Sequence, residues 1–81
     1  MFAVVNCKNC NQEVKLKGNL KDGIITIKNQ FCPHCNLDFS KHIHIVECAL
    51  DYILAANRRN LTSDMHDSSV GFSLVSVSNE D

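Results

Sequence analysis

Two short segments with one pattern constrain this chain more than any other feature. Residues 7–11 and 32–36 each place two cysteines three positions apart and follow the second cysteine with an asparagine. A gap of two residues lets one tight turn aim both sulfurs at one point, and two such turns supply the four soft ligands that Zn²⁺ binds as a tetrahedron. The sequence therefore predicts a zinc site with the ligands Cys7, Cys10, Cys32 and Cys35.

The asparagine after each cysteine pair fits the same interpretation. A chain that leaves such a turn usually passes through positive φ, which Asn tolerates better than most residues except Gly, so we expect this conformation at Asn11 and Asn36. Four cysteines leave no open coordination position, so the expected zinc is structural, one ion per chain. The alternatives are two disulfides or a redox motif, but redox C-x-x-C motifs occur singly beside a βαβ pattern that this sequence lacks.

The length of the chain makes a metal important. Its 81 residues allow one domain, and so short a chain buries too little apolar surface to be stable without a metal, disulfides or a partner. Zinc thiolates and a fifth cysteine, Cys48, fit a reducing cytoplasm. Residues 1–6 lack the features of a signal peptide, and no apolar stretch approaches the ~18 residues of a membrane span. We therefore expect a cytoplasmic protein with no membrane partner.

The segment between the cysteine pairs predicts a β-hairpin. Residues 2–5 are a short β-prone run, and residues 13–17 alternate polar and apolar side chains as a half-buried strand does. Turn residues stand at both ends of residues 18–23, and residues 24–28 are a second β-prone run. A zinc ribbon of two or three antiparallel strands is the expected result.

One long amphipathic helix is expected after the second cysteine pair. Residues 41–59 contain no Gly or Pro, Ser40 is a suitable N-cap, and Asn60 is a suitable residue for the C-terminal cap. Its apolar side chains form two adjoining stripes. The first stripe is Ile43, Val46, Leu50 and Ile53, widened by Leu54, and the second is Ile45, Ala49, Tyr52 and Ala56.

A small ribbon covers only one of these stripes, so something else must cover the remainder. We expect a homodimer through the helix, and the alternative is a helix buried by the C-terminal segment of its own chain. The residues expected at the dimer or partner interface are Ile43, Val46, Leu50, Ile53 and Leu54.

The predicted organisation is a small α+β fold with two parts. Residues 1–60 form the zinc ribbon and helix, and residues 61–81 form an acidic C-terminal segment. Within that segment residues 61–69 are turn-rich and predict a loop. Residues from Phe72 onward come close to alternation, so Phe72, Leu74 and Val75 or Val77 predict a final strand. This strand extends the ribbon's sheet or adds to a partner's sheet as an edge strand, and the alternative is a disordered tail.

Net charge is −1 for the whole chain but is unevenly distributed. Residues 1–60 hold all eight Lys and Arg residues against five acids, a formal charge of +3, while residues 61–81 hold four acids and no basic residue, a charge of −4. Zinc with four thiolates adds about −2, which lowers the first part to about +1. This is a weak electrostatic case for nucleic acid, for which strongly basic domains are typical.

Eight side chains are still candidates for phosphate contacts. Lys15 and Lys17 share one face of their strand, because strand side chains alternate, and the tips of cysteine turns contact nucleic acid or protein partners in many ribbons. The alternative is an ordinary solvated strand face. The candidate nucleic-acid-binding residues are Lys8, Lys15, Lys17, Lys21, Lys28, His34, Arg58 and Arg59.

Several other residues have ordinary structural interpretations. His34 is expected to be exposed and unligated, because four cysteines already fill the tetrahedron. His44 and Cys48, four positions apart with His42 just before them, have the spacing of a second metal site, but a helical histidine and a buried thiol are more often structural. The aromatic residues are expected in the core: Phe2, Phe31, Phe39, Tyr52 and Phe72.

Residues 5–36 resemble the Com family, small zinc-finger proteins of Mu-like phages that regulate translation by binding messenger RNA. The matching residues are Cys7-Lys8-Asn9-Cys10-Asn11 and Cys32-Pro33-x-Cys35. The resemblance implies a phage-encoded, zinc-stabilised regulator that binds RNA.

Two classes of function are therefore expected. The first is a small regulator that binds nucleic acid, either mRNA or DNA, to control gene expression. The second is a protein-binding module, such as an inhibitor of a host or defence enzyme, that acts through its helix, edge strand and acidic tail. The sequence contains no nucleophile–base pair, phosphate loop or open metal site, so it predicts neither an enzyme nor a small-molecule substrate.

Overall fold

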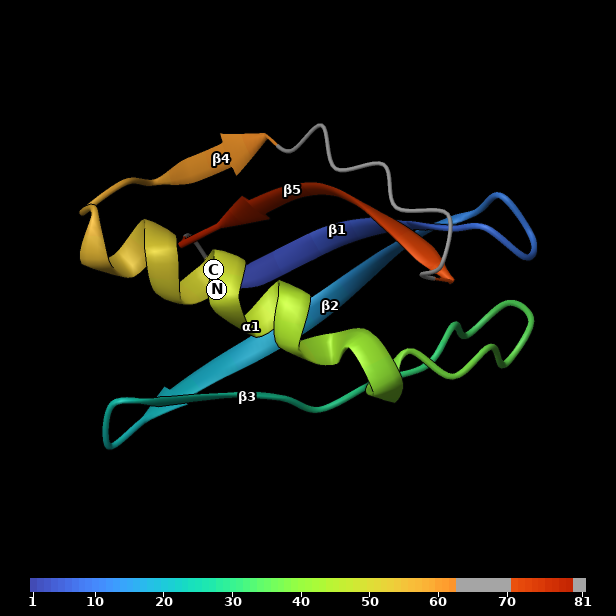
Figure 1. Ribbon diagram of the computed structural model, residues 1–81, viewed down its shortest axis with the longest axis horizontal. Coiled ribbons are helices and arrows are strands. Elements are labelled where there is room, and N and C mark those ends of the chain that lie inside the picture. Colours follow the sequence, from blue (N-terminus) through green and yellow to red (C-terminus); the bar gives the residue numbers. More distant parts are fainter. Residues whose placement is uncertain (63–70, 80–81) are drawn as a thin grey trace.

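One antiparallel sheet organises the structure, a computed structural model in which residues 1–62 and 71–79 are described. The strands lie in the order β3-β2-β1-β5-β4, and α1 lies across one face of the sheet (Figure 1). The small α+β class expected from the sequence is thus confirmed. The elements are β1 Phe2–Cys7, β2 Glu13–Lys21, β3 Ile24–Ile27, a 3₁₀ turn at Ser40–His42, α1 Ile43–Ala55, β4 Asn60–Thr62 and β5 Phe72–Ser78.

Strands β2 and β3 form a hairpin with a two-residue turn. Lys21 pairs with Ile24, and the residues between them, Asp22 and Gly23, have φ values of 54° and 78°. Positive φ at both central positions defines the type I′ turn, whose twist matches that of the flanking strands. The turn is therefore shorter than the predicted residues 18–23. Gly18 lies inside β2, where a Cβ atom would stand 3.1 Å from Leu50 Cδ1, so glycine lets the helix approach the strand.

Strand β5 joins the other side of β1. Ala3 pairs with Leu16 of β2 and with Val77 of β5, and the register between β1 and β5 shifts between Val4 and Val5. The final strand thus extends the sheet of the cysteine hairpin, which was the first of the two expectations. Because β4 pairs with its far side, β5 is an internal strand and not an edge strand. The first residues of the predicted loop, Leu61 and Thr62, belong to β4.

The helix is shorter than the sequence predicts. Residues 40–42 form a 3₁₀ turn, and α1 begins without a side-chain cap from Ser40. It ends in a Schellman motif, in which Asn57 N–H donates to Leu54 O (3.2 Å) and Arg58 N–H donates to Ile53 O (2.8 Å). Asn57 takes the left-handed conformation with φ of 55°. The helix therefore ends before Asn57, and Asn60 lies in β4 instead of capping the helix.

The first apolar stripe of the helix packs on the sheet of its own chain. Ile43, Val46, Leu50 and Ile53 are buried in one core with residues from β1, β2, β3 and β5. These four side chains therefore cannot supply the predicted dimer surface, because the chain's own sheet, including its C-terminal strand, covers them. Leu54 is half-buried. A homodimer stays a prediction, and no described helix has the length and hydropathy that crossing a membrane requires.

Only two of the five aromatic side chains expected in the core are fully buried. Phe39 and Phe72 meet edge to face, with ring centroids 5.0 Å apart. Phe31 and Tyr52 are exposed, and Phe2 is half-buried. The prediction was wrong for these three because size and aromaticity alone do not report which side of a strand or helix a residue occupies.

Replacing Leu50 with Ala should lower the free energy of unfolding by about 2–5 kcal/mol, because it leaves a cavity in the core. Tyr52 is on the same helix but is 54% exposed, so Tyr52→Ala should change that free energy by no more than about 0.5 kcal/mol. Chemical denaturation followed by circular dichroism measures both. Similar losses for the two variants would contradict the burial of the first stripe.

Candidate metal centre

The two cysteine turns have the same local geometry. Cys7 ends β1 and Cys10 lies in the turn before β2, while Cys32 and Cys35 lie between β3 and the 3₁₀ turn. Asn11 N–H donates to Cys7 O, and Asn36 N–H donates to Cys32 O, each at 2.8 Å. The φ values of Asn11 and Asn36 are 57° and 62°. The expectation of positive φ after each cysteine pair is therefore confirmed.

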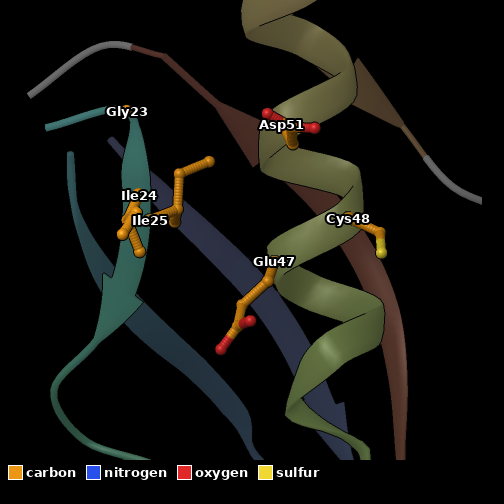
Figure 2. Close-up of a pocket in the computed structure, with 6 residues that line it drawn as sticks. All are labelled: Gly23, Ile24, Ile25, Glu47, Cys48 and Asp51. Carbon is orange, nitrogen blue, oxygen red and sulfur yellow. The ribbon is translucent and has the colours of Figure 1, made fainter. Parts of the chain in front are cut away.

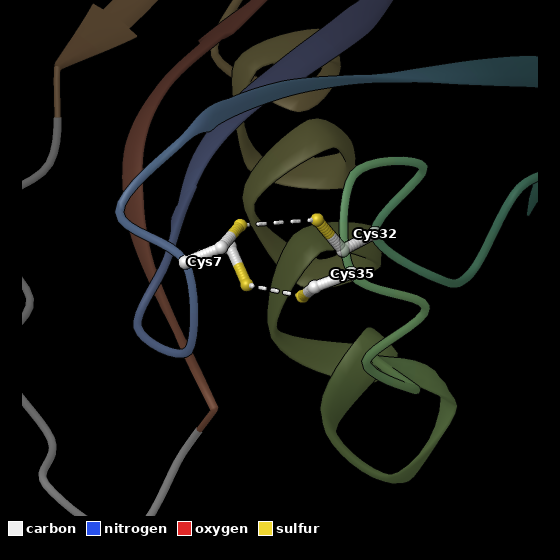
Figure 3. Close-up of side chains that lie close together, drawn as sticks. Cys7, Cys32 and Cys35 are labelled. Atoms are coloured by element: carbon white, nitrogen blue, oxygen red, sulfur yellow. Dashed lines mark hydrogen bonds between the residues drawn. The ribbon is translucent and has the colours of Figure 1, made fainter.

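The two turns bring four sulfur atoms together. All four lie within 4.8 Å of one another, and Figure 3 shows the side chains of Cys7, Cys32 and Cys35 turned toward one another. The Sγ atoms of Cys7 and Cys35 are 3.6 Å apart, as are those of Cys10 and Cys32. A tetrahedral ion with metal–sulfur bonds of ~2.3 Å separates its sulfurs by about 3.8 Å. The four cysteines therefore fit a metal site with four thiolate ligands.

Disulfides do not describe this cluster. Bonded sulfurs stand ~2.05 Å apart, whereas all five cysteines are free. The shortest sulfur contacts, 3.6 Å, also join one turn to the other and not the two cysteines of one turn. A single metal ion would instead be bound by the cysteines of both turns at once.

The pKa values of Cys10 and Cys35 are shifted in opposite directions. Burial raises the pKa of Cys10 to about 12, whereas a hydrogen bond from the Asn9 side chain holds the pKa of Cys35 down at about 6. A metal binds the deprotonated sulfur, so its arrival must release the protons that remain. The proton of Cys10 is therefore released to solvent when a metal binds its sulfur.

The cluster is connected to both halves of the fold. Cys7 pairs with Phe72 at the start of β5, and Lys8 N–H donates to Gly71 O at 3.0 Å. On the other side, Phe39 follows the second cysteine turn and packs against Phe72. The cluster therefore lies where the sheet, the C-terminal strand and the segment leading to the helix come together.

The sheet face opposite the helix carries a second group of candidate residues. Val14 and Leu16 of β2 point into the core, so Lys15, Lys17 and Lys21 point outward, and each of these lysines is exposed. The same alternation in β3 buries Ile25 and Ile27, and the exposed Lys28 follows the end of that strand. Alternation thus brings three of the eight predicted residues, Lys15, Lys17 and Lys21, to one face.

The aromatic ring of Phe2 lies among these lysines. Phe2 pairs with Lys17 in the register of β1 and β2, and Lys15 Nζ stands 4.1 Å from the centroid of the Phe2 ring. Such an exposed cation–π contact stabilises by about 0.5–1 kcal/mol. A concavity of about 340 Å³ is lined by Met1, Phe2, Lys15, Lys17, Gly18 and Asn19. Phe2 was expected in the core, although alternation with the apolar Ala3 and Val5 places it on the outer side.

The other four predicted residues lie elsewhere. Lys8 and His34 are exposed on the two cysteine turns, and Arg58 and Arg59 are exposed after α1. Asn79 N–H donates to Arg59 O at 2.7 Å, so Arg59 lies beside the end of β5. These four side chains do not share the outward side of β2 and β3.

A second concavity of about 300 Å³ lies at the surface between the β2–β3 hairpin and the helix. Figure 2 shows Ile24 and Ile25 on the hairpin side and Glu47 and Asp51 on the helix side. Cys48 also lines it and is exposed, not buried as expected. Within residues 1–62 and 71–79, only the four clustered cysteines form a group of three or more potential metal ligands. The spacing of His44 and Cys48 therefore has no geometric support as a second metal site.

No protein-family model matches the chain, and no curated protein or solved structure is significantly similar to it. The resemblance to the Com family stays a prediction.

Replacing Cys32 with Ser should remove the bound metal and several kcal/mol of stability, because metal binding contributes directly to folding in small domains of this kind. Cys48→Ser is the matched control, since Cys48 lies outside the cluster and is exposed. Native mass spectrometry should find one metal per chain in the wild type and in Cys48→Ser, and a chelator should lower the melting temperature of both. Retention of one metal by Cys32→Ser would contradict the four-cysteine site.

Proposed function

We propose that this protein is a small zinc-stabilised regulator that binds nucleic acid through the outer face of its sheet. The observation that carries the proposal is the outward placement of Lys15, Lys17 and Lys21 on the face opposite α1, with the exposed Lys28 just after the neighbouring strand. Ammonium groups spaced along neighbouring strands match the repeating charge of a phosphate backbone, and binding them releases the counterions of the nucleic acid.

The distribution of charge favours this face of the sheet over other surfaces as the nucleic-acid-binding site. Residues 1–31 contain five lysines and only two acids, Glu13 and Asp22. Two other acids, Glu47 and Asp51, lie on α1, which packs on the opposite side of the sheet. The outer face is therefore locally positive although the whole chain carries a net charge of −1. A local positive face suffices to attract phosphates at short range.

Zinc is the metal that the four-cysteine cluster favours. Thiolates are soft ligands, and a tetrahedral set of four suits Zn²⁺ better than the harder divalent cations. A site closed by four protein ligands leaves no position for substrate, so the proposed ion acts through stability. Its part in the function is to hold β1, β5 and the second cysteine turn together, and so to keep the sheet face in shape.

The proposed regulator acts by occupancy. A module of this kind controls expression by covering a site that another factor needs, which requires affinity and not a reaction. The resemblance of residues 5–36 to the Com family supports the same class of function.

A second candidate function, binding a protein partner, is favoured by the concavity between hairpin and helix. Ile24 at its rim is 64% exposed, and Glu47 and Asp51 supply negative charge beside it. The surfaces first expected to serve this function are less suitable, because the helix stripe is buried and β5 is internal. The acids of the tail, Asp64, Asp67, Glu80 and Asp81, lie outside the described residues.

Lys17→Gln should weaken nucleic-acid binding, because it removes one phosphate contact, and should lower the slope of log affinity against log salt by about 1. Lys41→Gln is the charge-matched control, since Lys41 lies in the 3₁₀ turn that leads into α1. Fluorescence anisotropy with labelled oligonucleotides at several salt concentrations measures both. Equal effects of the two substitutions, or no salt-dependent binding by the wild type, would contradict the proposal.

A further inference from the structure

The outer face of the sheet carries more than lysines, and we infer that its ligand is single-stranded nucleic acid, with one base stacked on Phe2. The inference rests on the proposed nucleic-acid-binding function and names the form of the ligand. It is carried by the cross-strand register of β2, β1, β5 and β4, which places a cationic, an apolar and a polar zone side by side on this face.

Two rows of side chains run across the four strands. Residues that pair in neighbouring antiparallel strands point to the same side of the sheet, about 5 Å apart. The first row is Lys17, Phe2, Ser78 and Asn60, of which Ser78 is buried, and the second is Lys15, Val4, Ser76 and Thr62. Each row therefore begins with an ammonium group and passes through an apolar side chain on β1. The polar groups exposed at the far end are those of Asn60 and Thr62 on β4, with Ser76 of β5 half-buried beside them.

This order matches the parts of an unpaired nucleotide. The ammonium groups pair with phosphates, and the aromatic ring stacks on the flat face of a base. Hydroxyl or amide groups form hydrogen bonds with base edges or with the 2′-hydroxyl of RNA. The concavity beside Phe2, about 340 Å³, falls within the range of small-ligand sites. Lys15 and Lys17 both line it, so charge and ring stand within one nucleotide-sized site.

A duplex suits this face less well. Double-stranded DNA is read by a helix or a β-ribbon that enters a groove. Here α1 lies on the opposite side of the sheet, where its apolar stripe is buried, and the outer rows belong to the sheet itself. A rigid duplex would meet only the lysines, whereas a single strand can turn its bases onto Phe2 and Val4.

The contact between Lys15 and Phe2 is compatible with this role. Lys15 Nζ lies 4.1 Å from the centre of the ring that the base would use. Lys15 is an exposed side chain, so a base can take its place on the ring while the ammonium group moves to a neighbouring phosphate. Stacking of a base on an aromatic side chain typically contributes about 5- to 150-fold in affinity, which favours the exchange.

The test uses two substitutions at Phe2. Phe2→Leu keeps an apolar side chain but removes the ring, and should weaken binding to single strands roughly tenfold. Phe2→Trp keeps a ring and introduces the only tryptophan, since the chain has none. Its fluorescence should be quenched when a base stacks on it. Thermal melts of both variants establish that the fold is intact.

The ligands are one labelled oligonucleotide of mixed sequence as single-stranded RNA, as single-stranded DNA, and annealed to its complement. Tighter binding to either single strand than to the duplex, with quenching of Phe2→Trp by that strand, is the expected result. Duplex binding as tight as that of both single strands, or unchanged emission at saturation, would overturn the inference. In that case the sensitivity to Lys17→Gln still decides the proposed function, because that test does not involve stacking.

Discussion

Four cysteine sulfurs lie in one cluster at one end of the sheet, and the arrangement of the other elements depends on this cluster. The two cysteine turns are separated by 21 residues, and bringing such distant segments together costs conformational entropy that a small core offsets poorly. A metal held by both turns closes this loop directly. Because Cys7 ends β1 and pairs with Phe72 of β5, the same closure fixes the point from which β1, β5 and the segment leading to α1 extend.

The two faces of the sheet follow from this arrangement. One face receives the apolar stripe of α1 and becomes the core, with Gly18 giving the helix room against β2. The side chains that alternate with the core therefore point to the opposite face, and in β2 these are Glu13, Lys15, Lys17, Asn19 and Lys21. The same register that buries Ala3 and Val5 turns Phe2 outward beside Lys15 and Lys17. The binding surface that we propose is thus a consequence of how the core is built.

Features encoded by short-range patterns could be predicted from the sequence. The cysteine spacing predicted the cluster, the asparagines predicted positive φ, and alternation predicted the common face of Lys15 and Lys17. The 3-4-3 spacing of Ile43, Val46, Leu50 and Ile53 likewise identified the apolar stripe of the helix. Each of these depends on a pattern of residues only a few positions apart, and for the cluster the same short pattern occurs twice.

Features that depend on distant pairing could not be predicted in this way. Strand β5 pairs with β1 across most of the chain, and this pairing is what makes it internal and lets it cover the helix stripe. Without that pairing, a second copy was the natural cover for the stripe. The end of the helix was misplaced for a local reason, because Asn57 and Asn60 are equally good caps by residue type. The Schellman hydrogen bonds are what select Asn57.

The central claim is that one zinc ion joins both cysteine turns, and X-ray absorption at the zinc edge tests it most directly. The protein purified without added metal should contain zinc surrounded by four sulfur atoms at about 2.3 Å and by no nitrogen or oxygen. A zinc shell containing nitrogen or oxygen would contradict the account, as would a folded protein that contains no zinc.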